Sequence, residues 1–280
     1  MLIDKPAGPT SHDVVARVRR ALGTREVGHA GTLDPFATGL LVLLIGRATR
    51  LARFVERLPK GYRTVVRLGQ ATDTDDATGR VIIERPLDPW PSEPEVRTGL
   101  ESLAGVQRQR PPAYSARRVE GRRGYELARA GVAVELPARE VTVYRVELIR
   151  YQPPLLEFSA TVSAGTYIRA LARDLGERLG TAAHCLELRR EWIGPFLVNQ
   201  ATDLAAVGSG TPLLTPLRLV EGLQQVALAP GQAEQIGRGK TIPAESGRGG
   251  EAALVWQDRL VAVAERIGEQ WQPRIVLEPA

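Results

Sequence analysis

The sequence predicts an α+β protein, and three observations lead to that fold class. Of the 280 residues, 43% are apolar and 25% charged, which is ordinary for a globular chain. The segments 141–150 and 155–163 have strand character and follow each other without a helix between them. The amphipathic segment 166–179 and the capped segment 10–22 predict helices elsewhere in the chain. Strands that can pair directly, with helices interspersed, favour α+β over a doubly wound sheet.

The remaining elements follow in chain order. Thr10 to Asp13 has the pattern of a capping box, and Gly23 suits the end of the helix that follows. Further patterns predict a buried strand at 40–45, a helix at 48–58, strands at 62–68 and 81–83, and a helix at 95–103.

The segment from Gly208 to Pro212 is the best domain boundary, because turn-forming residues dominate it. Short strands at 252–255 and 260–264, separated by turn residues, suit a small β-barrel beyond it. The sequence therefore predicts one domain over 1–211 and a second over 213–280.

The net charge of +5 is unevenly distributed. The stretch from Leu213 to the end has 7 basic and 8 acidic residues, so the excess positive charge lies before it. A basic body favours a polyanionic partner such as nucleic acid. Of the 37 basic residues only Lys5, Lys60 and Lys240 are lysines, and a GC-rich genome is a second explanation for that bias towards arginine.

Several features point to a cytoplasmic protein without membrane association. No apolar run approaches the roughly 20 residues that span a bilayer. The N-terminal residues lack the zones of a signal peptide. Cys185 is the only cysteine, so no internal disulfide is possible, which suits a reducing compartment.

Metal, nucleotide and serine-hydrolase chemistry are disfavoured. His184 and Cys185 have no second ligand pair for zinc. The segment from Asp73 to Glu84 resembles a calcium loop but places Ala77 and Thr78 where a ligand and a glycine are needed. No phosphate-binding loop, dinucleotide fingerprint or nucleophile elbow is present.

The segment from Gly28 to Gly39 is the strongest candidate for a site. Glycines and Pro35 predict a rigid, tightly shaped loop directly before a buried strand. The loop contains one histidine, His29, and one carboxylate, Asp34. Spacing alone names no reaction, because an aspartate before proline is usually a turn residue and a lone histidine is usually structural.

This segment closely resembles the catalytic motif of the TruB family of pseudouridine synthases. Other blocks resemble the motifs of that family in the same order: 4–13, 60–63 with 72–76, 111–116 with 124–131, 165–169 and 188–190. The resemblance implies a catalytic domain built on a mixed, mainly antiparallel sheet with flanking helices. It also implies a small PUA-like RNA-binding β-barrel after that domain, where the match is weaker.

The resemblance implies that the T-loop uridine at position 55 of tRNA is isomerised to pseudouridine, with no metal and no cofactor. Asp34 is the implied catalytic carboxylate, and Arg169 is the partner that keeps it ionised. Tyr62 would stack on the flipped base and take or relay a proton. Tyr167 and Leu188 would form the pocket wall, and His29 would fill the space that the base vacates. Ordinary packing or solvation is the alternative for each, and the route of glycosidic bond cleavage stays open.

Direct RNA contacts are expected from a cluster of arginines beside the third motif. Arg117, Arg118, Arg122 and Arg123 are four arginines in seven residues, which suits phosphate contacts, although a solvated loop would look the same. Asp76 is assigned either to RNA or to a nearby basic side chain. The expected partner is the T stem-loop of tRNA, bound by a monomer that needs no protein partner.

Two other functions remain open. The chain could be a non-catalytic module that binds or folds tRNA, although the combination of Asp34, Tyr62 and Arg169 favours an enzyme. It could also act on another RNA, as guide-RNA-dependent relatives do. Those relatives usually need partner proteins and added terminal segments, so a stand-alone bacterial type is favoured.

Overall fold

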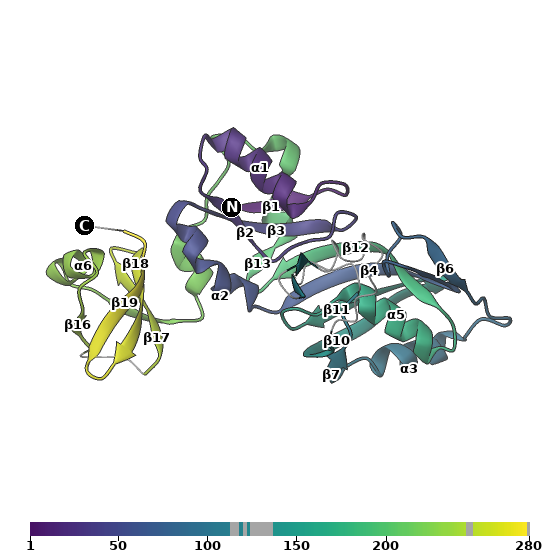
Figure 1. The fold of residues 1–280 in the computed structure, drawn as a ribbon. Helices are drawn as coiled ribbons and strands as arrows, with labels where there is room; N and C mark the ends of the chain where they lie inside the picture. The colour runs from purple at the N-terminus through teal and green to yellow at the C-terminus, as the bar shows by residue number, and fades with distance from the viewer. Residues whose placement is uncertain (113–117, 120–121, 124–136, 245–248, 279–280) are drawn as a thin grey trace.

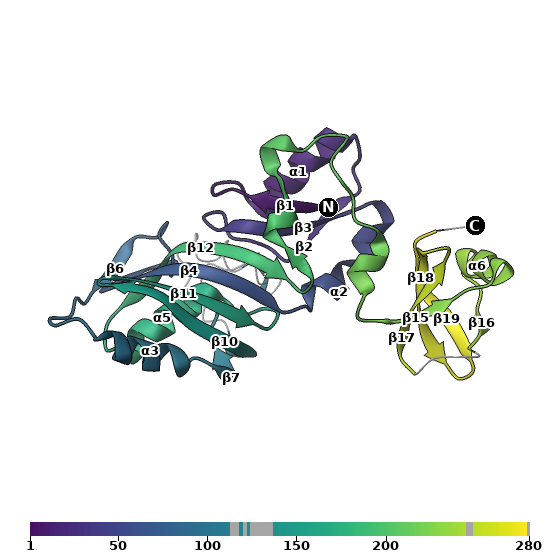
Figure 2. The ribbon, with the colours of Figure 1, turned by 180° about the vertical axis from the view of Figure 1, so that it is seen from behind.

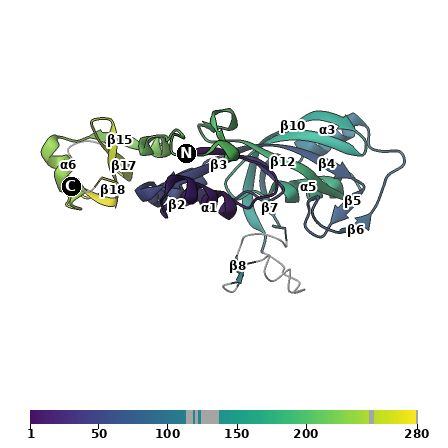
Figure 3. The same ribbon diagram turned by 90° about the horizontal axis from the view of Figure 1, so that it is seen from above.

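A computed structural model of the chain describes residues 1–112, 118–119, 122–123, 137–244 and 249–278. A large α+β body carries the N-terminus, and a smaller C-terminal unit lies at one end of it (Figure 1). Seen from above, the hairpin of β5 (Gln70–Thr72) and β6 (Val81–Glu84) lies at the opposite end of the long axis (Figure 3). In the described part of the chain, no helix is long and apolar enough to cross a membrane.

The body is organised around a ten-stranded sheet, with strands in the order β14-β1-β3-β12-β4-β11-β10-β7, while β2 pairs with β3 and β13 with β12. The β1–β14 and β3–β12 pairs are parallel and the others antiparallel, which agrees with the expected mixed, mainly antiparallel sheet. The strands are β1 (Leu2–Lys5), β2 (Val27–Ala30), β3 (Thr38–Ile45), β4 (Lys60–Leu68), β7 (Gly105–Gln109), β10 (Arg139–Gln152), β11 (Leu155–Val162), β12 (Ala183–Ile193), β13 (Phe196–Leu197) and β14 (Thr202–Asp203).

Helix α1 (Ser11–Leu22) forms as the sequence predicts. Thr10 and Asp13 make a reciprocal capping box, and Gly23 ends the helix in the left-handed conformation at φ 64°. Its buried face, which includes Val14 and Val18, packs against apolar residues of β1 and β3. This packing holds the N-terminal segment beside the strand that follows the Gly28–Gly39 loop.

Helices α3 (Glu93–Glu101) and α5 (Ile168–Arg178) pack together in the other half of the body (Figure 2). Leu171 and Leu175 of α5 share one apolar cluster with Val66 of β4 and Phe158 of β11. The smaller elements of the body are β5 (Gln70–Thr72), β6 (Val81–Glu84), β8 (Arg118–Val119), β9 (Arg122–Arg123), η2 (Val198–Gln200) and η3 (Leu204–Ala206).

The single helix expected at 48–58 is divided in two. A 3-10 helix, η1 (Gly46–Leu51), leads into the short α-helix α2 (Ala52–Glu56). Gly46, at φ 60°, turns the chain out of β3, and the tighter winding of η1 follows directly. Leu51 and Val55 are fully buried, so both pieces still present one apolar face to the body.

The C-terminal unit is a curled five-stranded sheet, in the order β15-β17-β18-β19-β16, with α6 packed against it. Its elements are η4 (Pro216–Val220), β15 (Gln224–Ala227), α6 (Pro230–Gly237), β16 (Ile242–Pro243), β17 (Glu251–Trp256), β18 (Arg259–Ile267) and β19 (Gln270–Val276). Val263 and Ile275 share an apolar cluster with Leu51 and Val55 of the body, and Arg53 pairs with Glu251 across the contact. The unit is therefore packed onto η1 and α2.

Candidate active site

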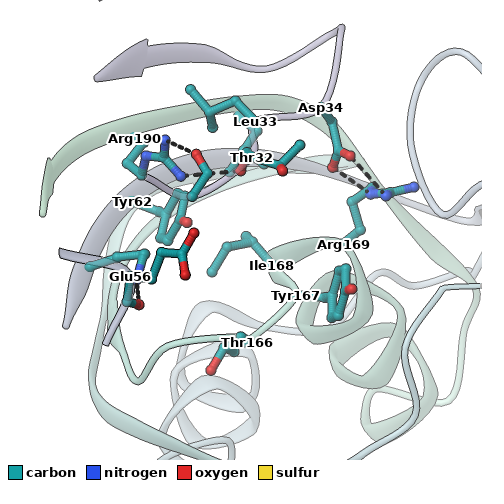
Figure 4. Close-up of a pocket in the computed structure, with 14 residues that line it drawn as sticks. Thr32, Leu33, Asp34, Glu56, Tyr62, Thr166, Tyr167, Ile168, Arg169 and Arg190 are labelled. Carbon is teal, nitrogen blue, oxygen red and sulfur yellow. Dashed lines mark hydrogen bonds and ion pairs between the residues drawn. The ribbon is translucent and has the colours of Figure 1, made fainter. Parts of the chain in front are cut away.

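A pocket of about 600 Å³ opens between the loop 31–37, β4, β12 and the start of α5 (Figure 4). Fourteen residues line it: Gly31, Thr32, Leu33, Asp34, Glu56, Lys60, Tyr62, Gly165, Thr166, Tyr167, Ile168, Arg169, Leu188 and Arg190. The register of the sheet brings these segments together, because Arg190 of β12 lies opposite Tyr62 on one side and Gly39 on the other.

Arg190, which is 1% exposed, binds main-chain carbonyls of the loop. Its guanidinium donates from Nε to Leu40 O at 2.8 Å, and from Nη1 and Nη2 to Thr32 O and Gly31 O at 3.2 and 3.0 Å. Gly39 passes close by with φ at 100°, and a Cβ there would lie 2.3 Å from the Arg190 carbonyl oxygen. The loop therefore needs glycine at 39, for both its conformation and its contact with β12.

The other side of the loop is held by the segment before α1. Ser11 Oγ accepts from Leu33 N at 2.9 Å, and the fully buried Lys5 donates to Pro35 O at 3.2 Å. Lys5 Nζ also donates to Pro6 O and Pro9 O. Burial lowers the pKa of Lys5 to about 8, while Asp34 raises it and Arg190 lowers it further. Main-chain contacts thus fix the peptide units on both sides of Asp34.

Asp34 faces Arg169 across the pocket, as the resemblance implies. Arg169 Nη2 donates to Asp34 Oδ1 at 3.2 Å, and its Nε lies 3.0 Å from Oδ2, so the contact involves both carboxylate oxygens. The Asp34 side chain is 33% exposed, whereas that of Arg169 is 3% exposed. The carboxylate is thus open to a ligand in the pocket, and its counter-ion is enclosed by protein.

Asp76, expected to contact either RNA or a nearby basic side chain, lies beside Arg169. Its side chain is 5% exposed, and Oδ2 accepts from Arg169 Nη1 at 3.0 Å, which is a contact with a nearby basic side chain. The other oxygen, Oδ1, accepts from Thr74 Oγ1 and from the amide and hydroxyl of Thr78. Asp76 therefore orients Arg169, which also donates to Thr74 O at 2.7 Å.

The pKa of Asp34 reflects opposing influences. Burial raises it and the Arg169 guanidinium lowers it, while the Asp76 carboxylate raises it again. The net direction is upward, so Arg169 offsets only part of the desolvation penalty. Without Arg169 the carboxylate would be harder to ionise.

Tyr62, Tyr167 and Leu188 line the pocket as expected. Tyr62 and Leu188 are buried in β4 and β12, and Tyr167 lies directly before α5. Figure 4 shows Ile168 between the Tyr62 side and the Tyr167 side of the pocket. Aromatic and aliphatic side chains thus form walls against which a flat base can pack.

His29 does not line this pocket. It lies on β2, and its ring meets that of His12 edge-on at 5.8 Å between centroids. Burial lowers its pKa, and His12 and Arg190 lower it further, so the imidazole is neutral near pH 7. Its Nδ1 is buried without a hydrogen-bond partner within the described part of the chain.

The expected RNA-contacting arginines are only partly placed. The backbones of Arg118 and Arg123 lie opposite each other in the antiparallel pair of β8 and β9, and Arg122 also belongs to β9. Arg117 lies outside the described residues. The prediction for these four side chains therefore stays a prediction.

The site prediction missed three charged residues that line the pocket: Glu56, Lys60 and Arg190. Arg190 and Lys60 could have been found, because alternate residues of a strand share a face, so Leu188 implies Arg190 and Tyr62 implies Lys60. Lys60 Nζ donates to Glu56 O and Leu58 O at 2.8 and 2.9 Å, and burial lowers its pKa to about 8. Glu56 is the last residue of α2 and lines the pocket. Its position depends on how η1 and α2 pack against the body, which no sequence motif predicts.

No group of three or more histidine, cysteine, aspartate or glutamate side chains that could hold a metal ion occurs among the described residues. His184 Nδ1 lies 2.9 Å from Gln70 O, and Cys185 is fully buried with its Sγ 3.1 Å from Thr64 Oγ1. Burial raises the pKa of the Cys185 thiol to about 12. Both side chains are thus engaged in packing and hydrogen bonding within the sheet.

Comparison with known proteins places this chain in one family. Residues 19–168 match the profile of the TruB family pseudouridylate synthase (N terminal domain). The tRNA pseudouridine synthase B of Thermobifida fusca is 45% identical, over 99% of this chain and 97% of that protein. The protein of the same name from Mycobacterium tuberculosis is 42% identical, over 100% of this chain and 96% of its own length.

Two solved structures share the fold over nearly the whole chain. A Cbf5-Nop10-Gar1 complex contains a chain with 26% identity and a TM-score of 0.75, covering 99% of this chain and 84% of that one. An H/ACA RNP bound to a substrate RNA containing 2'-deoxyuridine contains another, with 23% identity, the same TM-score and the same coverage. The second likeness concerns the fold alone.

Proposed function

Because this chain belongs to the TruB family of pseudouridylate synthases, we propose that it isomerises the T-loop uridine at position 55 of tRNA to pseudouridine, with Asp34 as the catalytic carboxylate. The chain is an isomerase that acts on a uridine of tRNA, as the names of its full-length relatives indicate. The observation that carries the assignment of Asp34 is the geometry of the pocket. The Asp34 carboxylate is one-third exposed and faces the cavity. Its buried partner, the Arg169 guanidinium, is also paired with the Asp76 carboxylate.

The reaction requires the target nucleotide to leave the RNA stack, because no protein atom can reach its sugar while the base is stacked. In the pocket, the base packs against Tyr62, Tyr167 and Leu188. The C1′–N1 bond breaks, the base turns, and a C1′–C5 bond forms. N1 gains a proton and C5 loses one, so the product has the same composition as the substrate.

Asp34 acts at the sugar as an anion. It attacks C1′, stabilises a cationic sugar, or supports a route that begins with loss of a proton from C2′. In each of them the carboxylate must be ionised within a pocket that burial makes unfavourable for charge. We assign to Arg169 the task of opposing that penalty, and to Tyr62 the stacking contact and the transfer of a proton.

His29 need not line the pocket to serve as a wedge, since the space that a flipped base vacates lies within the RNA. Its neutral imidazole suits stacking on the neighbouring bases. The arginines at 117, 118, 122 and 123 are assigned to backbone phosphates. The body is taken as 1–211, and the unit at 213–280 as a PUA-like domain that contacts RNA near the acceptor stem. We place the enzyme in the cytoplasm as a monomer that needs no protein partner and no cofactor.

The experiment uses unmodified tRNA transcript and chemical mapping of pseudouridine. We expect product at position 55 in wild-type transcript and none in a transcript with cytidine at that position. An isolated T-arm stem-loop should also be modified, because the proposed recognition is of the loop. If pseudouridine formed only at other uridines, the proposed target at position 55 would be wrong. No product from either RNA would favour a tRNA-binding or tRNA-folding module.

A further inference from the structure

Arg169 is the second residue of α5, so the position of that helix's first turn determines what the guanidinium can reach. It must contact Asp34 and Asp76 at once, each at about 3.0 Å. Tyr167, at the N-cap position, supplies no side-chain capping bond. The first turn must therefore be held by something else, since helix N-termini leave main-chain groups without partners.

Gln109, the last residue of β7, supplies that contact. Its side chain is 1% exposed and its amide binds both main-chain groups of Tyr167. Nε2 donates to Tyr167 O at 3.0 Å, and Oε1 accepts from Tyr167 N at 2.8 Å. A primary amide carries one acceptor and a donor at the spacing of a peptide unit, so Gln109 pairs with Tyr167 as a neighbouring strand would.

Two arginines, Arg139 of β10 and Arg173 of α5, make further contacts between this edge of the sheet and the region around the start of α5. Arg139, opposite Gln109 in the β7–β10 pair, donates to Ala164 O at 3.3 Å. A Cβ at Gly165 would lie 1.6 Å from Arg139 Nη2, so only glycine allows this approach. One helical turn after Arg169, Arg173 donates to Arg110 O at 3.0 Å and to Asp75 Oδ2 at 2.8 Å. The end of β7 thus contacts α5 both before and after Arg169.

We infer that Gln109 is a positioning residue for the reaction: by pairing with Tyr167 it holds the first turn of α5 where Arg169 reaches Asp34 and Asp76 together. This inference rests on the proposed function of Asp34 and Arg169. Gln109 itself does not line the pocket. Its loss should lower the rate of the chemical step and leave RNA binding nearly unchanged.

The test is Gln109→Glu, assayed on tRNA transcript under single-turnover conditions across pH. The ionised carboxylate can accept from Tyr167 N but has no proton for Tyr167 O, so one bond is replaced by a repulsion. Protonation restores a donor and an acceptor in the same shape. We expect the maximal rate relative to wild type to fall about tenfold or more near pH 8.5 and to recover to within about threefold near pH 6. The RNA dissociation constant should change by less than about threefold.

Gln107→Glu is the matched control. Gln107 lies on the same strand and the same face, but its amide donates to Leu103 O, a residue outside α5. The Gln107→Glu variant introduces the same charge, and its maximal rate should stay within about twofold of wild type at every pH. A uniform loss of rate in both variants would overturn the inference, because it would reflect charge or stability alone.

If Gln109→Glu does not fold, Gln109→Met fills the same space and makes neither bond. A rate loss of about tenfold that does not vary with pH would then support the inference, and a wild-type rate would overturn it. An active wild type with an unaffected Gln109→Glu variant overturns only the role of Gln109. An inactive wild type overturns the proposed function and this inference with it.

Discussion

Arg190→Lys tests how much the buried guanidinium contributes to the shape of the catalytic loop. Arg190 donates three hydrogen bonds, to the carbonyls of Gly31, Thr32 and Leu40. A lysine keeps the charge but its single ammonium cannot reach all three acceptors. If two charged bonds are lost at about 1.5 kcal/mol each, the free energy of unfolding falls by about 3 kcal/mol. The fold should survive, since domains are typically stable by about 5–15 kcal/mol.

The expected effect on catalysis is larger than the effect on binding. Freed carbonyls at Gly31 and Thr32 let the loop shift, and a displacement of about 1 Å at a reacting group can cost about a hundredfold in rate. The assay follows tritium released from C5 of labelled uridine in tRNA, since that hydrogen leaves when C5 joins the sugar. Chemical denaturation of the same samples gives the free energy of unfolding.

Arg189→Lys is the control, because Arg189 lies next to Arg190 on β12 but pairs with Asp4, and its side chain is 39% exposed. An exposed pair contributes only about 0–1 kcal/mol, so this variant should stay close to wild type in stability and rate. The reasoning would be refuted if Arg190→Lys lost less than about 1 kcal/mol and kept its rate within about twofold.

Four further predictions follow from the same contacts. Arg169→Lys should lose about a hundredfold or more in single-turnover rate with RNA affinity within about threefold, and a loss confined to affinity would point to an RNA contact instead. Because burial raises the pKa of Asp34, the rate should fall as pH drops through a pKa above the ordinary 3.8, and an acid limb at or below that value would contradict the account. Because the pKa of Asp34 is raised in the folded state, the free energy of unfolding should fall as pH rises between the ordinary and the raised pKa. Chemical denaturation of the wild type and of Asp34→Asn across that pH range measures this change. Gly39→Ala should destabilise the fold by about 2–4 kcal/mol, since its Cβ meets the Arg190 carbonyl at 2.3 Å, and an unchanged melting curve would show that the loop can move aside.

The sequence predicted the elements whose ends and faces are set by residues close together in the chain. The capping box at Thr10 and the glycine at 23 delimit α1, and the period of apolar residues places α5. The Gly28–Gly39 pattern predicted a rigid loop ahead of a buried strand. The loop does precede β3 but is shorter than expected, because 28–30 belong to β2 and β3 begins at Thr38, so only 31–37 form it. The resemblance to a family, and not the spacing, predicted that Asp34 and Arg169 would meet.

Contacts between distant segments could not be predicted from the sequence alone. Arg190 binds carbonyls about 150 residues away in the chain, and the buried position of Asp76 depends on how its turn packs against α5. The pairing of Gln109 with Tyr167 spans 58 residues and involves main-chain groups, which no side-chain pattern reveals. Each of these depends on the finished sheet.

The central claim is that Asp34 performs the reaction and does not merely shape the loop, and Asp34→Asn tests it most directly. Asparagine has the same shape and can still accept a hydrogen bond from Arg169, so the loop and the RNA affinity should persist. The account predicts tRNA binding within about threefold of wild type and no detectable pseudouridine after prolonged single-turnover incubation. Pseudouridine formed by Asp34→Asn at a rate near that of wild type would contradict it.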